Sequence, residues 1–445
     1  MQVLKKTAIG FCLAATLLSY SSCQKDDNNK GNVSIAFEQQ FGSTELMEYA
    51  DVKQTDDGGF LLLGTIDADD VTSDKRDIYV VKTDSDGNQE WAKKYGTTNS
   101  QGYNYDEEGV KLVKISSTEY LVAGNQNFYK NNVIEKTKIV LYKIDANGNV
   151  IGNDIILRNG GTEAAFSEEI NDIKADGTDF ILTGKTSNVF PNKPGGTQTG
   201  DIADILVMKL DNQLQRTWAQ EVSGFDKKDE GLEVMVKNGS YVVISTVQEG
   251  SHQLNTQLHI ASYEKTRGAM LSTRRYGQSG EYATVRAATI NPADEVITIL
   301  GEVTTGTAAG DLLLLQVDNM LDNKTAVKAT GSDFMLFGNV AGNMTAALLQ
   351  AGDISYLSTT GGFVISYTDV QITTNDLGIL KIDPSFNIEE DYPKVLEAKG
   401  VGAKAGAILP IVVENNGNTV VDSYVLSATL GTTRSQQLGI FKLKD

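Results

Sequence analysis

Four carboxylates share one spacing in the first half of the chain and could do chemistry together. Each precedes an aromatic residue by 12 positions, and the four are Glu48, Glu108, Glu168 and Asp229. Acidic side chains gathered around one opening can hold a cation, or act as the acid and base of glycan cleavage. They can also cap backbone N–H groups of their own or a neighbouring strand. We favour capping, because the spacing does not recur along the whole chain.

A second acidic motif is Asp84-Ser85-Asp86-Gly87-Asn88, which is echoed at residues 145–149. Its acids resemble those of a calcium-binding loop. Such a loop needs a bidentate Glu at its twelfth position, where this chain has Tyr95. Asp-Gly and Asn-Gly pairs favour the positive φ angles of tight turns. We therefore predict hairpin turns at both segments, and no bound metal.

Histidine and cysteine are too rare for the common metal and nucleophile sites. The two cysteines, Cys12 and Cys23, lie at the N-terminus, and the two histidines are His252 and His259. A zinc site or a histidine-based triad would need clustered partners that the sequence does not provide. We expect both histidines on the surface, and we expect no cofactor.

A third group of residues is suited to binding. Aromatic residues flanked by Asn and Gln occur in three long polar segments, and they are Tyr103, Tyr105, Phe128, Tyr129 and Phe190. Aromatic faces surrounded by amides suit a sugar or a peptide. Long loops can instead pack on themselves. The hypothesis is that the five side chains form a ligand patch on one face.

The elements that must position these residues are strands. Alternating apolar residues, most often ending in Lys-apolar-Asp, recur seven times, at residues 77–84, 138–145, 204–211, 258–265, 311–318, 376–383 and 437–444. Two further strand-like runs precede each copy, and a run that usually ends in Gly follows it. Four strands in every 50–70 residues match the blade of a β-propeller. The four acids would then stand at the starts of the innermost strands, near one mouth of the central channel.

The last repeat lacks its fourth strand, because the chain stops at Lys444-Asp445. The missing pattern stands at the other end, where residues 34–42 resemble residues 89–96. We therefore predict an all-β fold, a single seven-bladed β-propeller of four-stranded antiparallel blades over residues 33–445, with the N-terminal strand closing the last blade.

One repeat also carries a family resemblance. Residues 55–64, Thr-Asp-Asp-Gly-Gly-Phe-Leu-Leu-Leu-Gly, followed by the strand-turn-strand at 77–96, resemble the Asp-Gly-Gly-Tyr repeat of secreted prokaryotic β-propellers. The first repeat matches well and the later ones are degenerate. The resemblance implies the propeller fold, and it implies no single activity.

The N-terminus has the pattern of an export signal. Residues 1–22 have a short basic start and an apolar core, as in a signal peptide, and Cys23 follows small residues as in a bacterial lipobox. Residues 23–32 are polar and predict a flexible tether. Cys23, Lys25, Asp26 and Asp27 resemble the export signal of Bacteroidetes-type surface lipoproteins. This resemblance implies acylation of Cys23 and display on the outer face of the outer membrane.

Net charge narrows the class of partner. The chain carries 39 basic and 58 acidic residues, for a formal charge of −19. Nucleic acid and anionic lipid favour the opposite sign. We expect a lipoprotein that contacts the membrane only through its lipid anchor, and that acts as a non-catalytic binding module for a glycan or for a protein partner in an outer-membrane complex. The alternative is a polysaccharide-directed hydrolase or lyase that uses the channel-mouth carboxylates.

Overall fold

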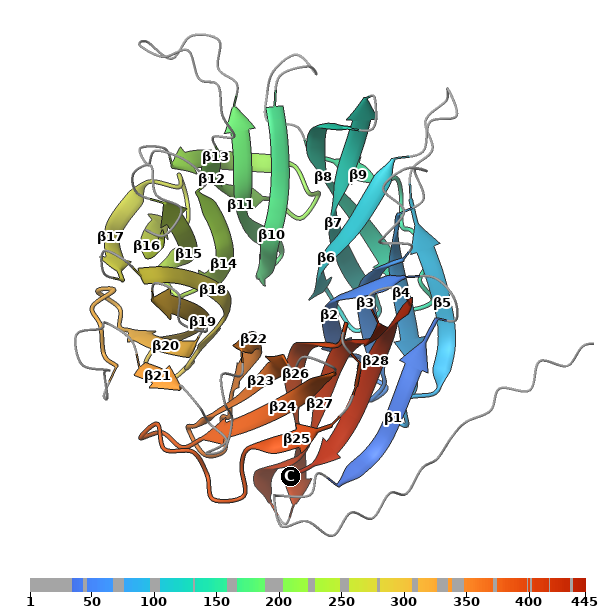
Figure 1. Ribbon diagram of the computed structural model, residues 1–445. Helices are drawn as coiled ribbons and strands as arrows, with labels where there is room; N and C mark the ends of the chain where they lie inside the picture. The colour runs from blue at the N-terminus through green and yellow to red at the C-terminus, as the bar shows by residue number, and fades with distance from the viewer. Residues whose placement is uncertain are drawn as a thin grey trace, which may run out of the picture.

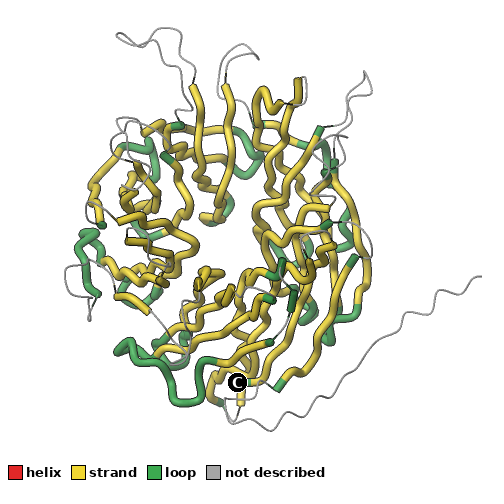
Figure 2. Tube along the Cα trace, in the orientation of Figure 1, coloured by secondary structure: helices red, strands yellow, loops and turns green. Residues whose placement is uncertain are grey.

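The computed structural model describes residues 34–42, 46–66, 76–96, 105–130, 133–157, 166–188, 203–222, 229–248, 256–277, 281–305, 311–325, 335–337, 348–370, 374–397, 399–400, 402–415, 417–432 and 435–445. Within these residues the regular elements are all β-strands (Figure 2). In the same residues, no helix is long and apolar enough to cross a membrane.

The strands follow one another in antiparallel meanders of four. The first three are β2 (Met47–Gln54), β3 (Phe60–Ile66), β4 (Asp77–Thr83), β5 (Gln89–Tyr95); β6 (Asp106–Lys114), β7 (Glu119–Lys130), β8 (Val133–Asp145), β9 (Ile155–Ile156); and β10 (Phe166–Asp176), β11 (Asp179–Asn188), β12 (Asp204–Leu210), β13 (Arg216–Val222). The next three are β14 (Glu230–Val236), β15 (Ser240–Gln248), β16 (Thr256–Glu264), β17 (Met270–Tyr276); β18 (Glu281–Ile290), β19 (Ile297–Thr305), β20 (Asp311–Val317), β21 (Met335–Phe337); and β22 (Leu348–Tyr356), β23 (Phe363–Val370), β24 (Asn375–Ile382), β25 (Lys394–Leu396). The last strands are β26 (Lys404–Asn415), β27 (Asn418–Thr432) and β28 (Ser435–Lys444).

The first strand of the chain, β1 (Ile35–Phe41), completes the final meander. It pairs antiparallel with β28, so that Phe41 lies opposite Leu438 and Ile35 opposite Leu443. The sheet order β1-β28-β27-β26 therefore joins the two ends of the described chain, as the match between residues 34–42 and 89–96 predicts.

The meanders stand side by side around a common axis, with the first strand of each one innermost (Figure 1). This is a propeller-type arrangement. The described strands form six hydrogen-bonded sheets, because β16 and β18 share a single parallel pair, Thr256 with Tyr282, that merges two meanders into one eight-stranded sheet. The sequence predicted seven separate four-stranded sheets, and the described strands form five four-stranded sheets and one eight-stranded sheet.

Apolar side chains fill the spaces between neighbouring sheets. One such cluster joins Leu61 and Leu63 of β3 to Val122 of β7 and Val140 of β8, all at most 1% exposed. Both faces of the central strands are covered, which is why β3 is buried along its whole length. Near-continuous apolar runs at these strands follow from burial on both faces.

The two ends of the ring differ in their connections. Since each meander is antiparallel, the connections between second and third strands lie at the end where the first strand begins. We call this end the loop face. The turns between first and second strands, and between third and fourth strands, lie at the opposite end, which we call the turn face.

Candidate functional site: charged rows on the innermost strands

A bulge interrupts every innermost strand that the structure describes. The register of pairing with the second strand shifts near the middle of β2, β6, β10, β14, β18, β22 and β26. A bulge adds a residue to one strand and re-aims the side chains beside it. Charged residues of the first four meanders stand in register on either side of this bulge, in two rows.

The first row lies nearer the loop face and consists of Glu48, Glu108, Glu169 and Glu230. Lys185 Nζ of β11 lies 2.9 Å from Glu169 and 3.6 Å from Glu230, and so bridges two neighbouring meanders. Arg76 lies 3.7 Å from Glu48. The row is open to solvent, since the side chain of Glu48 is 46% exposed.

Glu108 is the most perturbed member of this row. Burial raises the pKa of its carboxyl, and the charges of Glu48 and Glu169 raise it further against the opposing effect of Arg76 and Lys185. The groups that act on it come from β2, β10 and β11 and from Arg76, so four segments of the chain converge at this mouth of the ring.

The predicted members Glu168 and Asp229 do not belong to this row. Both are fully buried, Glu168 lies opposite Thr186, and Asp229 accepts a hydrogen bond from the Gln248 N–H at 3.2 Å. The error has a local cause. Five residues separate the pair Gln54 and Phe60 across the first hairpin, whereas four separate Val236 and Tyr241. Counting back from the aromatic residue therefore places the acid one position too early, on the opposite face.

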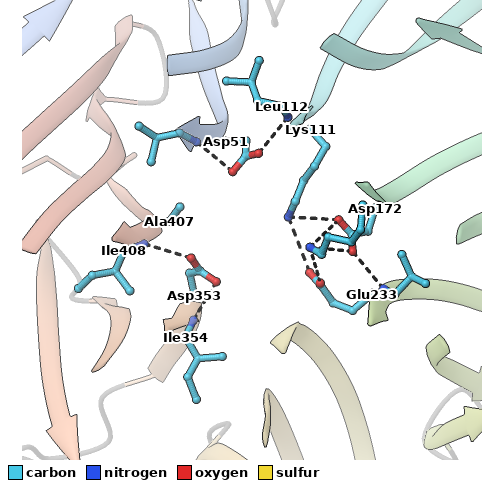
Figure 3. Close-up of polar contacts among 12 residues, drawn as sticks. Asp51, Lys111, Leu112, Asp172, Glu233, Asp353, Ile354, Ala407 and Ile408 are labelled. Atoms are coloured by element: carbon cyan, nitrogen blue, oxygen red, sulfur yellow. Dashed lines mark hydrogen bonds and ion pairs between the residues drawn. The ribbon is translucent and has the colours of Figure 1, made fainter. Parts of the chain in front are cut away.

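The second row directly follows the bulge and was not predicted from the sequence. It consists of Asp51, Lys111, Asp172 and Glu233, joined by Asp353 from the bulge of β22. Their side chains point into the space between the innermost strands, and Lys111 reaches across toward Asp172 and Glu233 (Figure 3). The residue types alone could not predict this row, because a bulge shifts the pairing register of a strand without changing the amino-acid composition of that strand.

Lysines hold the acids of this row together. Lys111 Nζ lies 3.6 Å from Asp172 and 3.9 Å from Glu233. Lys174 donates to Asp172 at 3.0 Å and lies 3.5 Å from Glu233. Lys53 lies 2.8 Å from Asp51. The three lysines come from the innermost strands β2, β6 and β10. They face carboxylate side chains that are at most 8% exposed.

The aspartates of the second row also tie three of the innermost strands to their neighbours. Asp51 accepts from the Leu112 N–H at 2.9 Å, Asp172 from the Val234 N–H at 3.0 Å, and Asp353 from the Ile408 N–H at 3.1 Å. In each case the donor belongs to the first strand of the next meander. Capping of backbone N–H groups, of the same or a neighbouring blade, is the role favoured for the four predicted acids. Asp229 does this within its own meander, at the Gln248 N–H, and the second-row aspartates cap the neighbouring strands.

The buried acids Asp172 and Glu233 have pKa values displaced in opposite directions. Burial opposes ionisation of Asp172, but Lys174, Lys111 and the Val234 N–H hold its pKa at about 2. Burial and the negative charge of Asp172 raise the pKa of Glu233 to about 8, against the pull of the same two lysines. The second row therefore favours the neutral form of Glu233 and the ionised form of Asp172.

The predicted aromatic patch is only partly described. Tyr103 and Phe190 lie outside the described residues, and Tyr105 is half-buried just before β6. Phe128 and Tyr129 were predicted in a loop, but they belong to β7, where Phe128 lies opposite Lys136 and Tyr129 opposite Ile134.

The reason lies in the polar residues that precede them. Asn125 donates to the Ile170 carbonyl and accepts from the Ile170 N–H, and Asn127 accepts from Thr137 at 2.8 Å. Gln126 donates to Glu107 at 2.8 Å. The amides therefore find partners within and between the sheets, and the strand continues where its composition suggested a loop.

Both turn motifs form the predicted hairpin turns. Asp84 accepts from the N–H groups of Asp86 and Asn88 at 2.9 and 2.8 Å, and Asp145 repeats the pattern. Across the part of the chain that the structure describes, no three His, Cys, Asp or Glu side chains form a group that could hold a metal ion.

The predicted surface position of His259 is wrong. It lies in β16 and is 3% exposed, with Nε2 2.6 Å from the Thr273 hydroxyl, and burial lowers its pKa to about 4. His252 and the predicted export residues Cys23, Lys25, Asp26 and Asp27 lie outside the described residues.

Comparison with known proteins identifies no family. No protein-family model matches the chain, and no curated protein matches it. Among solved structures, a Dyadobacter fermentans protein of unknown function is 9% identical with a TM-score of 0.48, over 93% of this chain and 99% of the other. A Trypanosoma rangeli sialidase in complex with the inhibitor DANA is 11% identical with a TM-score of 0.43, over 78% of this chain and 57% of the sialidase. A Bacteroides caccae protein of unknown function is 9% identical with a TM-score of 0.38, over 80% of this chain and 95% of the other. At these values the likeness identifies neither a function nor a site.

Proposed function

We propose that this protein is a surface-displayed lipoprotein whose propeller, with seven four-stranded blades, is a non-catalytic binding module that takes its ligand at the loop face. The repeat resemblance and the seven meanders support the blade count. The pattern around Cys23 supports the anchor, which predicts acyl groups on Cys23 in the mass of the protein purified from its membrane. Protease shaving of intact cells tests display, since a protected body would contradict it.

The observation that carries the binding proposal is the contrast between the two charged rows. The second-row acids Asp51, Asp172 and Asp353 are committed to backbone N–H groups of neighbouring strands. The first row keeps exposed oxygen atoms, with the side chains of Glu48, Glu169 and Glu230 between 31% and 46% exposed. Side chains that can meet a ligand therefore gather at the loop face.

The loop face is also where strands extend beyond the blade. β7 has 12 residues and β8 has 13, against seven in each of β3 and β4, and the added pairs lie at this end. The extension carries Phe128 and Tyr129, and Tyr105 lies at the same end. Carboxylates and aromatic residues at one end of the ring suit the hydroxyl groups and apolar faces of a glycan, or a protein partner.

Binding is tested on a glycan array and by pull-down from outer-membrane extract. A Glu48→Gln, Glu230→Gln double variant and a Tyr129→Ala variant should each weaken the ligand found by at least about tenfold, since interface anchors commonly contribute that much. Glu414→Gln on the turn face is the matched control and should bind as the wild type does. Equal binding by all four proteins would refute the loop-face assignment.

One observation favours a second candidate, a polysaccharide-directed hydrolase or lyase. Glu108 has a raised pKa beside the carboxylates of Glu48 and Glu169, and carboxyl groups with displaced pKa values are what acid–base cleavage of glycans requires. Turnover of a polysaccharide by the wild type, abolished in Glu108→Gln with binding retained, would establish the enzyme and overturn the non-catalytic proposal.

A further inference from the structure

Exposed apolar side chains gather at one end of the ring. Nine large hydrophobic residues are exposed among the described residues, and eight of them lie toward the turn face: Ile35, Val150, Ile151, Met270, Leu271, Met320, Val412 and Val413. The ninth, Tyr282, is the second residue of β18 and lies at the loop face. Scattered apolar residues need no explanation, but their concentration at one end does.

The most prominent of these groups is a hairpin that overruns its sheet. Ser423 lies opposite Lys444, the last residue of β28, so residues 412–415 of β26 and 418–421 of β27 extend past the neighbouring strand. The hairpin has two pairs of valines, Val412 opposite Val421 and Val413 opposite Val420. Val412 is 48% exposed and Val413 is 39% exposed, so both valines face solvent, just behind the polar end of the hairpin that carries Glu414, Asn415 and Asn418.

The chain joins the ring beside this hairpin. β1 is a fourth strand, so it begins at the turn face, with Ile35 opposite Leu443 in the sheet that also contains β26 and β27. Eleven residues, 24–34, separate Cys23 from Ile35. Eleven residues can span at most roughly 40 Å. An anchor at Cys23 would therefore attach the ring to the bilayer from its turn face.

We propose that the turn face rests on the bilayer that carries the anchor, with the β26–β27 hairpin, Met320 and Leu271 in the interfacial region and the loop face pointing away. The inference depends on the proposed lipid anchor, and it adds a second membrane contact to it. Apolar residues on a surface that a lipid anchor holds beside the bilayer lengthen its residence there, because binding strength grows with the apolar area that is buried in the interface.

The charge of the turn face specifies the lipid. Aspartates open five of the turns between third and fourth strands, and they are Asp84, Asp145, Asp211, Asp318 and Asp383. Anionic headgroups attract basic segments and repel acidic ones. The surface that this face fits is therefore zwitterionic, and anionic lipid weakens the contact.

The test measures the accessibility of single labels. Cys12 leaves with the signal peptide and Cys23 is blocked by acylation, so the lipidated protein offers no other thiol. Met320→Cys and Val413→Cys on the turn face, and Tyr282→Cys on the loop face, are labelled with a fluorophore on phosphatidylcholine vesicles. Iodide quenching should fall at least about threefold at the two turn-face positions and remain unchanged at Tyr282, as expected for interfacial burial. Replacing a third of the lipid with phosphatidylglycerol should restore part of the quenching.

Several outcomes would overturn the proposal. Equal quenching at all three positions on an anchored protein refutes the contact. Protection that grows with protein density shows a second copy of the chain, and protection only after adding outer-membrane protein shows a protein partner. Absence of acyl groups by mass refutes the anchor instead. The labels are then measured on a mature chain held at position 23 by a histidine tag on nickel-chelating lipid, which tests the face independently.

Discussion

The ring of Phe37 in β1 covers Gly87 in the turn between β4 and β5, so closely that a methyl group on Gly87 would lie 2.6 Å from a ring carbon. Trp91 covers Gly148 in the same way at 2.7 Å, and Trp218 covers Gly268 at 2.5 Å. An aromatic residue of a fourth strand thus packs on the outer turn of the next meander. Phe37 repeats that contact at the junction between the two ends of the chain.

Substituting Phe37 should therefore open the seam. Phe37 is half-buried and its ring lies 6.4 Å from that of Phe60. Phe37→Ala should lower the free energy of unfolding by about 2 kcal/mol, since a partly buried aromatic side chain is removed. Urea unfolding measures the loss, and Gln40→Ala, an exposed change in the same strand, should alter it by less than about 0.5 kcal/mol. Equal effects would show that the seam does not depend on this contact.

Gly148 supports a second prediction. The cost of its packing against Trp91 can be separated from the cost of its positive φ angle by comparison with another glycine. Its φ angle is 73°, and Trp91 leaves no room for a side chain. Gly148→Ala should destabilise the protein by about 3 kcal/mol, the sum of left-handed strain and displaced packing. The control is Gly177→Ala, where φ is 66° but nothing lies within 4 Å, and strain alone should cost about 1 kcal/mol. Equal losses in the two variants would show that packing on Trp91 adds nothing.

Much of this architecture could be read from the sequence because the signals are local. The alternation of residues 77–83, the turn chemistry of Asp84-Ser85-Asp86-Gly87-Asn88 and the match of residues 34–42 to residues 89–96 each depend on a few neighbouring residues. Strand periodicity and turn residues then predicted the meanders and the pairing of β1 with β28. The merging of two meanders through Thr256 and Tyr282 is a contact between units, which no single repeat encodes.

The charged rows could not be predicted in the same way. A first hairpin shorter by one residue moved the first row from Glu168 and Asp229 to Glu169 and Glu230. Asn125 and Asn127 looked like loop residues because their hydrogen-bond partners, Ile170 and Thr137, are distant in sequence or lie across the hairpin. Register and partner choice are tertiary effects that override local propensity.

Lys111 should be indispensable to the second row. It faces Asp172 and Glu233 at 3.6 and 3.9 Å, in a site where both carboxylates are nearly inaccessible. Removing one partner of a buried ionic network leaves uncompensated charge, so Lys111→Met should cost about 3 kcal/mol in the free energy of unfolding. Lys114→Met, which removes a surface ion pair with Asp56, should cost less than about 1 kcal/mol. Chemical denaturation measures both losses. A loss in Lys111→Met no larger than that in Lys114→Met would show that an apolar side chain can replace Lys111 in the second row.

The displaced pKa of Glu233 gives the protein a specific pH dependence. The folded chain holds this proton up to about pH 8, whereas the unfolded carboxyl releases it near 4.5. Between these values the folded state binds more protons, so stability falls as pH rises through the window. Asp172 adds no slope here, because its stabilising contribution is lost only as pH falls toward about 2. His259, with its pKa lowered to about 4, acts in the opposite direction but only below about pH 6.5.

Asp172 and His259 therefore add no slope between pH 6.5 and 8, and a comparison with Glu233→Gln measures the share of the slope that belongs to Glu233. A single group contributes at most about 1.4 kcal/mol per pH unit to the slope of unfolding free energy. The wild type should lose stability across this range, and Glu233→Gln, which keeps a neutral side chain of the same shape, should lose less. Glu230→Gln, a carboxylate of the more exposed first row, should keep the wild-type slope. Identical slopes in the wild type and Glu233→Gln would show that the second row holds no proton at neutral pH, and that its lysines alone balance the acids.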